Sequence, residues 1–223
     1  MKFKKIWLTS SLLILLLIGI AALQHGKWDR YYKNKLDQPP RQVIVKALNL
    51  FELPGKAIDI GCGVGNETIL MLNSGWQVWA IDSEPKALQI INQRKDIKDS
   101  RKLLAAIANF EENSTWDMLP QVDFISASYA LPFCNRHSFE KVWTHIKQKL
   151  NSGGRFAGHF FGLNYQGFTE KEMKQMTFFT KEEILNLLQD FDIEYFQEVE
   201  EDSKSGTGKA IHSHIFEVIV QKK

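Results

Sequence analysis

The sequence of 223 residues predicts an α/β fold in which helices cover both faces of a mostly parallel sheet. Short apolar runs alternate with helical patterns between residues 41 and 189, which is typical of parallel α/β sheets. The last two expected strands are separated only by the polar turn 202–209, so they should pair antiparallel. We therefore expect a seven-stranded sheet whose last strand is antiparallel.

Local signals justify most of these elements in chain order. Gly75 closes the second helix, and Pro85 lies in the first turn of the third. Thr180 and Glu183 form a capping box that opens the last helix. The expected helices are 41–51, 66–74, 85–94, 138–150 and 180–189, and the expected strands are 57–60, 77–81, 103–108, 122–128, 155–161, 193–200 and 211–220.

The first 35 residues differ in charge from the rest of the chain. They hold seven lysines and arginines and one acid, which leaves 21 bases and 25 acids after them. The larger part is therefore mildly acidic and lacks a basic stripe that would neutralise phosphates. No nucleic-acid partner is expected.

An apolar run at 6–23 follows the basic residues 1–5. It is about as long as a membrane-spanning helix requires, and it also resembles the apolar core of a signal peptide. Its cleavage pattern is poor, so we expect a single transmembrane anchor rather than a cleaved signal. Slightly more bases follow the run than precede it, which favours a cytoplasmic domain. We divide the remainder into a polar linker, 24–40, and a domain, 41–223.

The turn after the first expected strand carries the strongest chemical signal. Three alternating glycines, Gly61, Gly63 and Gly65, lead from a strand into a helix. Glycines let the backbone turn sharply and approach a ligand, and nucleotides bind at this turn in open α/β sheets. A dinucleotide fingerprint would require glycine at Asn66 and an apolar residue at Asp59. An acid at Asp59 can instead accept backbone N–H bonds from the turn and face a cationic ligand.

A second acid, Asp82, ends the next apolar strand about twenty residues after the first glycine. A carboxylate at this strand end can accept hydrogen bonds from both hydroxyls of a ribose. The alternative is a helix N-cap before Pro85. Combined with the glycine turn, Asp82 favours an adenosyl ligand that carries a positive charge and no pyrophosphate, namely S-adenosylmethionine.

With these motifs the chain resembles class I S-adenosylmethionine-dependent methyltransferases, and among them the small tellurite-resistance-type group. The stretches ASYALPFC at 127–134 and LNSGGRF at 150–156 also carry the resemblance. It runs from WDRYY at 28–32 to the C-terminus and leaves out only the anchor. It implies a Rossmann-like class I methyltransferase fold, S-adenosyl-L-methionine as cofactor and a small-molecule methyl acceptor.

The resemblance also implies roles for single residues. The three glycines would line the methionine part of the cofactor, with Asp59 supporting their loop, and Asp82 would bind the ribose. Asn109 stands where the family usually has an acid that accepts from the adenine amino group, and its amide oxygen can accept the same bond. Phe110 would pack on the adenine or belong to the core. The implied cofactor-binding set is Asp59, Gly61, Cys62, Gly63, Gly65, Asp82, Ser83, Asn109, Phe110 and Ser126.

Catalysis requires little of the protein, because a methyl group on a sulfonium is already activated and positioning supplies much of the rate. A general base is needed only if the acceptor must lose a proton. Tyr129 and His159 are the candidate catalytic residues. His212 and His214 share one face of an expected strand, and we expect packing rather than a metal site there.

The segment 162–177 follows the fifth expected strand, where this fold builds its acceptor pockets, and we expect Tyr165 or Phe168 to contact the acceptor. Two other functions remain open at this point. One is a membrane-tethered module that binds the cofactor without turnover, and the other is an NAD(P)-dependent oxidoreductase, which Asp59 and Asn66 disfavour.

Overall fold

The structure, a computed structural model, describes residues 28–36, 38–97 and 99–223. The expected anchor, 6–23, and the basic residues before it lie outside the described residues. Within the described part of the chain, no helix is long and apolar enough to cross a membrane.

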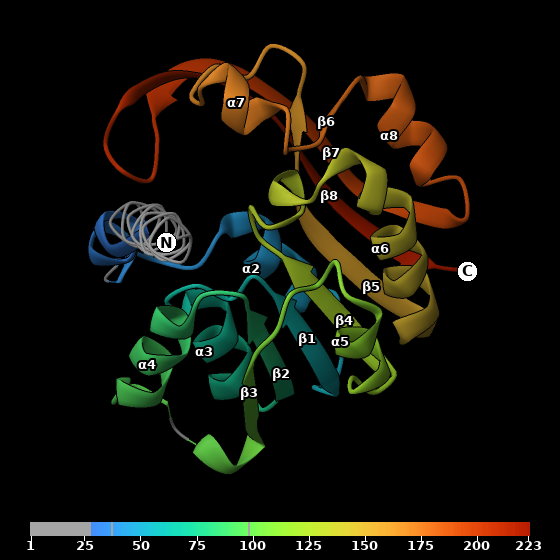
Figure 1. Ribbon diagram of the computed structural model, residues 1–223. Helices are drawn as coiled ribbons and strands as arrows, with labels where there is room; N and C mark the ends of the chain where they lie inside the picture. Colours follow the sequence, from blue (N-terminus) through green and yellow to red (C-terminus); the bar gives the residue numbers. More distant parts are fainter. Residues whose placement is uncertain (1–27, 37, 98) are drawn as a thin grey trace, which may run out of the picture.

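A single twisted sheet forms the centre of the molecule (Figure 1). Its main path has the order β3-β2-β1-β4-β5-β8-β7, and β8 is antiparallel to both of its neighbours. The short strand β6 pairs parallel with the end of β5, so the sheet has eight strands. The strands are β1 Lys56–Ile60, β2 Gln77–Asp82, β3 Leu103–Ile107, β4 Val122–Ala127, β5 Leu150–Gly162, β6 Phe178–Phe179, β7 Phe191–Lys204 and β8 Ala210–Lys222. The predicted fold is confirmed, with one strand more than expected.

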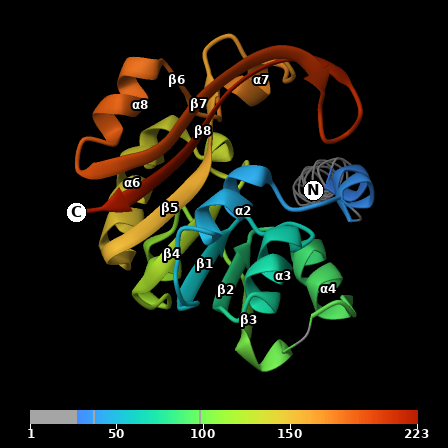
Figure 2. The same ribbon diagram turned by 180° about the vertical axis from the view of Figure 1, so that it is seen from behind.

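Helices cover both faces of the sheet, as the nearly continuous burial of the central strands β1 and β4 requires (Figures 1 and 2). On one face, α2 Gln42–Leu48, α3 Asn66–Asn73 and α4 Pro85–Gln93 pack on side chains such as Val78, Ala80 and Phe124. On the other, α5 Asn113–Asp117, α6 Arg136–Lys149 and α8 Lys181–Leu187 pack on Ile58, Ile125 and others. Three short helical turns complete the fold: η1 Ser100–Lys102, η2 Leu131–Phe133 and α7 Glu170–Met173.

The last hairpin differs most from its expected bounds. The polar residues expected as a turn at 202–209 continue the ladder, so that Asp202 pairs with His212 and Lys204 with Ala210. The hairpin therefore extends beyond the core and arches towards the N-terminal part of the described chain (Figure 1). Its polar side chains suggested a loop because this part of the hairpin has little apolar surface to bury.

Residues 28–35, within the expected linker, are helical. Tyr32 of this helix is buried and packs with Val64 and Leu88. These contacts join the helix to the domain. Residues 28–35 are therefore not a free linker, although the composition of 24–40 is polar.

Candidate functional site

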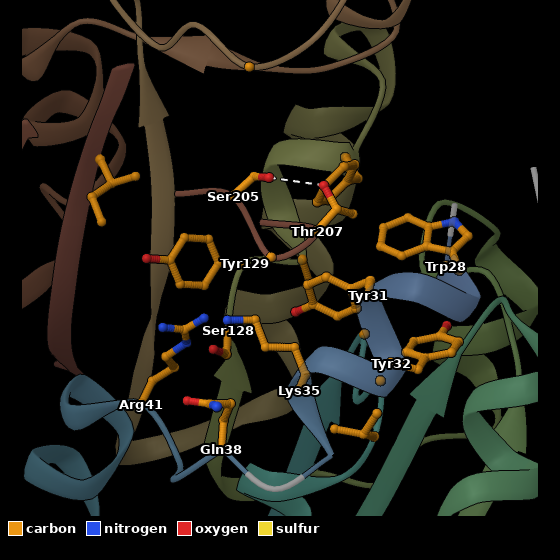
Figure 3. A pocket seen from close by; sticks show the side chains of 18 of the residues that line it. Trp28, Tyr31, Tyr32, Lys35, Gln38, Arg41, Ser128, Tyr129, Ser205 and Thr207 are labelled. Carbon is orange, nitrogen blue, oxygen red and sulfur yellow. Dashed lines mark hydrogen bonds between the residues drawn. The ribbon is translucent and has the colours of Figure 1, made fainter. Parts of the chain in front are cut away.

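A cavity of about 880 Å³ opens at the carboxyl ends of β1, β2 and β4 (Figure 3). It is surrounded by the glycine turn, the helix 28–35, the segments that follow β2, β3, β4 and β5, and the tip of the β7–β8 hairpin. Its volume lies in the upper range of small-molecule sites. Parallel α/β sheets bind ligands at this edge.

The glycine turn has a backbone that only glycine adopts easily. Gly61, Gly63 and Gly65 have φ angles of 64°, 52° and 83°. A Cβ atom at position 61 would lie 2.6 Å from the Cβ of Ala130, and one at position 65 would lie 2.7 Å from Ile91 Cγ1. At Gly63, which lines the cavity, the nearest atom would be Tyr32 Cε1 at 3.9 Å, so the cavity has open space beside this residue.

Asp82 joins the end of β2 to this turn. Its Oδ2 accepts a hydrogen bond from the backbone N–H of Gly63 at 2.8 Å, and its Oδ1 accepts one from the N–H of Glu84 at 2.9 Å. Burial raises the pKa of this carboxyl, and the two backbone donors oppose the shift. Each carboxylate oxygen keeps lone pairs for further donors. Asp82 therefore shapes the turn and can still accept from ligand hydroxyls in the cavity.

Asp59 has a different environment from the one expected. It is buried, it does not line the cavity, and its Oδ2 accepts from the hydroxyl of Thr68 on α3 at 2.5 Å. No backbone N–H of the turn is among its hydrogen-bond donors in the described chain. Burial raises the pKa of Asp59 to about 7. Its support of the glycine turn is therefore indirect, through the start of α3.

The remaining residues of the expected cofactor set divide into two groups. Cys62, Ser83 and Phe110 line the cavity. Ser126 is buried beside Asp59 in the sheet, and the Oδ1 of Asn109 accepts the backbone N–H of Glu111 at 3.0 Å. The amide oxygen of Asn109 is thus already engaged in its own turn.

Tyr129 and His159 lie together at the ends of β4 and β5. Tyr129 lines the cavity and is the only non-glycine residue of the described chain with a positive φ, 55°. His159 stacks on the Tyr129 ring at 4.0 Å and is fully buried, with Nε2 3.5 Å from Glu217 Oε1. Burial lowers the pKa of His159 and raises the pKa of Tyr129. His159 is therefore a support behind Tyr129, and it does not line the cavity.

His212 and His214 share a face of β8, as expected, and both contact acids of β7. His212 contacts Asp202 at 2.9 Å and Glu200 at 3.1 Å, and His214 contacts Glu198 at 3.1 Å. Among the described residues, no group of three or more histidine, cysteine, aspartate or glutamate side chains has the arrangement of a metal site. The pKa of His212 is raised by its hydrogen bond with Asp202 and then by that with Glu200. These histidines brace the hairpin.

The family model of tellurite resistance protein TehB matches residues 24–207, which is most of the chain. The chain belongs to the TehB family. Over 106 residues it is 26% identical to the probable S-adenosyl-L-methionine-dependent methyltransferase TehB of Haemophilus influenzae. That match covers 45% of this chain, and the chain spans about a third (34%) of that relative's length.

Solved structures share the fold. TehB from Haemophilus influenzae superposes with a TM-score of 0.68 at 17% identity, covering 82% of this chain and 63% of the other. The 1,6-didemethyltoxoflavin-N1-methyltransferase of Burkholderia thailandensis, solved with 1,6-didemethyltoxoflavin and S-adenosylhomocysteine, has a TM-score of 0.66 at 18% identity. It covers 96% of this chain and 90% of that one. The architecture is thus that of class I methyltransferases.

The TehB match begins before the helix 28–35, whose side chains form one wall of the cavity. Tyr31, Tyr32 and Lys35 come from this helix and Arg41 from the start of α2 (Figure 3), and none of them was predicted from the sequence as a site residue. The backbone N–H of Arg41 donates to Glu67 Oε1 at 3.0 Å, and its guanidinium carbon lies 4.7 Å from the centre of the Tyr129 ring. The WDRYY stretch was the only signal in the sequence that pointed to this wall.

Proposed function

We propose that the chain is an S-adenosyl-L-methionine-dependent methyltransferase that acts on a small-molecule acceptor. One observation carries the proposal. The carboxylate of Asp82 accepts a hydrogen bond from the N–H of Gly63, and the cavity has open space beside Gly63. This arrangement suits an adenosyl ligand, because the carboxylate can accept the ribose hydroxyls while the glycine backbone approaches the amino-acid end.

In this proposal the cofactor half of the cavity is formed by the glycine turn, Cys62, Asp82, Ser83 and Phe110. Asn109, Ser126 and Asp59 act from the second layer, since they do not line the cavity. Asn109 shapes the loop that presents Phe110, and Asp59 fixes the start of α3.

Arg41 and Lys35 extend the cofactor half towards the helix 28–35. Both line the cavity, and the guanidinium of Arg41 has no hydrogen bond or ion pair with any residue that the structure describes. Burial, and next the charge of Arg41, lower the pKa of Lys35. Two neighbouring cations suit the carboxylate of a methionyl group, and Glu67 beside them suits its ammonium.

When bound, the cofactor supplies a methyl group that its sulfonium already activates. The chain then has to align the acceptor and exclude water. Tyr129 stands at the end of β4, between the cofactor half and the segment after β5, and its raised pKa keeps its hydroxyl protonated near neutral pH. It can orient the acceptor by a hydrogen bond, and no side chain is needed as a base for an acceptor whose reacting atom has no proton to lose.

The comparisons support a small acceptor. A curated relative is described as a probable S-adenosyl-L-methionine-dependent methyltransferase, and the Burkholderia neighbour was solved with a small heterocyclic acceptor. The alternative is a module that binds the cofactor without turnover. No observed contact favours that alternative over an enzyme.

Titration calorimetry of the full chain tests the cofactor. We expect S-adenosylhomocysteine and S-adenosylmethionine to bind and NADH not to bind. Asp82→Asn should weaken binding at least about tenfold, because it removes a charged acceptor, while the exposed Asp192→Asn should not. Absence of S-adenosylhomocysteine binding at millimolar concentration would refute the assignment. Binding without methyl transfer to any member of a metabolite panel would favour the non-catalytic module.

We also propose, from the sequence, that residues 6–23 anchor the chain in a membrane with the domain on the cytoplasmic side. The full-length chain should then sediment with membranes after lysis, and detergent but not alkaline carbonate should release it. Recovery of the intact chain in the supernatant would contradict the anchor.

A further inference from the structure

The half of the cavity beyond the ends of β4 and β5 is walled by aromatic rings. Phe133 comes from the segment after β4, Phe161 from β5, and Tyr165 and Phe168 from the loop after β5. Phe161 and Tyr165 stack at 4.0 Å with 9° between their planes. Phe168 stacks with Tyr165 at 5.6 Å and meets Phe133 edge-on at 5.8 Å. With Tyr129 they form a ring wall, which we define as these five residues.

The ring wall is held in place by backbone pairing. Gln166 and His212 exchange two backbone hydrogen bonds, of 2.8 and 3.1 Å, which fix the loop after β5 to β8. A Cβ atom at Gly167 would lie 2.9 Å from Tyr165 Cε1 and 3.0 Å from Ile211 Cγ2. The loop therefore lies close against β8. Ile211 and Ile215 of β8 also line the cavity and add apolar surface to that of the rings.

The ring wall itself offers few polar groups. Its only hydrogen-bonding side-chain groups are the hydroxyls of Tyr129 and Tyr165. Burial raises the pKa of Tyr165 to about 12, and that of Tyr129 is also raised, so both hydroxyls stay neutral. The cations of the cavity come from the helix 28–35, from Arg41 and from the β7–β8 hairpin, and not from the segments that carry the rings.

Such a surface suits a flat, apolar molecule. Aromatic pairs gain about 0.5–1.5 kcal/mol beyond the burial of their area. A hydrated oxyanion would lose water here, and the cation nearest to the rings, Arg41 over Tyr129, is assigned to the cofactor in the proposed function. We infer that the methyl acceptor is an aromatic small molecule that packs on the ring wall and directs one polar group to Tyr129. This inference rests on the proposed function, since it assigns the second half of the same cavity.

The test is binding to the full chain saturated with S-adenosylhomocysteine. The probes are 2-naphthol and indole, cyclohexanol as a non-aromatic alcohol, and selenite as an inorganic oxyanion. We expect at least one aromatic probe to bind about tenfold or more tightly than cyclohexanol. Phe168→Ala should remove most of that preference, while S-adenosylhomocysteine affinity stays unchanged.

Phe196→Ala is the matched control, because Phe196 packs on Phe216 and does not line the cavity. Phe168→Leu keeps apolar volume without a ring and serves if the alanine variant fails to fold. Equal aromatic preference in the Phe168 and Phe196 variants would overturn the inference. So would binding of selenite with no aromatic probe bound at millimolar concentration. Failure of the wild-type chain to bind S-adenosylhomocysteine is a separate result that refutes the proposed function itself.

Discussion

Gly63 and Gly65 are two residues apart in the same turn, yet their replacement by alanine should damage different properties. Both have positive φ, where a residue with a Cβ costs about 1–2 kcal/mol. At Gly65 the new methyl would also lie 2.7 Å from Cγ1 of Ile91, which is a fully buried residue of the core. Overpacking of this kind costs about 1–3 kcal/mol more. We expect Gly65→Ala to lower the free energy of unfolding by about 2–5 kcal/mol.

Gly63→Ala should lose only the conformational part, about 1–2 kcal/mol, because its methyl would be 3.9 Å from the nearest atom of Tyr32. Gly63 lines the cavity, however, so the methyl would occupy space that the cofactor needs. We expect S-adenosylhomocysteine affinity to fall at least about tenfold, which corresponds to about 1.4 kcal/mol.

Urea denaturation and titration calorimetry separate the two effects. Gly208→Ala is the control, since Gly208 has φ 85° and its Cβ would meet nothing within 4 Å. If Gly65→Ala unfolds at the same urea concentration as Gly208→Ala, the contact with Ile91 does not restrict this position. If Gly63→Ala binds S-adenosylhomocysteine like the wild type, the turn does not contact the cofactor.

Three further predictions concern other parts of the fold. Burial raises the pKa of Asp59 from 3.8 to about 7, so the protonated carboxyl contributes fully to the free energy of unfolding below about pH 4, and this contribution is lost as the pH rises through 7. Asp59→Asn should therefore be more stable than the wild type at pH 8, by up to about 4 kcal/mol. In urea titrations this difference in the free energy of unfolding should become smaller towards pH 5, and a difference independent of pH would contradict the reasoning. Thr180→Ala removes the capping box with Glu183 at the start of α8 and should lower the free energy of unfolding by about 1 kcal/mol in the same assay, and an unchanged midpoint would count against the cap. Arg41→Gln should weaken S-adenosylhomocysteine binding about tenfold, whereas the exposed Arg101→Gln should not, and equal affinities would remove Arg41 from the cofactor half.

The elements predicted well from the sequence are those whose signals are local. Gly75 and Pro85 delimit α3 and α4 within one residue of the expected bounds, and the box at Thr180 is present with both of its hydrogen bonds. The strand β6 has two residues, too few for any periodicity to reveal. The helix 28–35 was missed because its contacts are with residues far away in the chain, such as Val64 and Leu88 around Tyr32 and Gly206, whose carbonyl oxygen accepts a hydrogen bond from Asn34 Nδ2. The outer part of the hairpin was missed because its side chains are polar, although its strands pair over residues close in sequence.

The residues of the site also divide into those with a local signal in the sequence and those whose role depends on packing. Asp82 and the three glycines could be recognised because one continuous stretch and one strand end carry them. The partner of Asp59 could not, because the choice between a backbone N–H and the Thr68 hydroxyl depends on how α3 packs. Asn109 matched a family position, and only the structure reveals that its amide oxygen is used by the next turn.

The contact between the hairpin tip and the helix 28–35 determines which shortened versions of this protein are useful. Gly206 lies so close to the Tyr31 ring that a Cβ atom there would be 2.4 Å from two ring carbons. A truncation that starts at residue 41, chosen to remove the apolar run 6–23, would keep every strand of the sheet. It would also delete Tyr31, Tyr32 and Lys35 from the cavity. A ligand screen with such a fragment would test a cavity that lacks one of its walls, and a negative result would not apply to the full chain. Expression trials should therefore cut before Trp28.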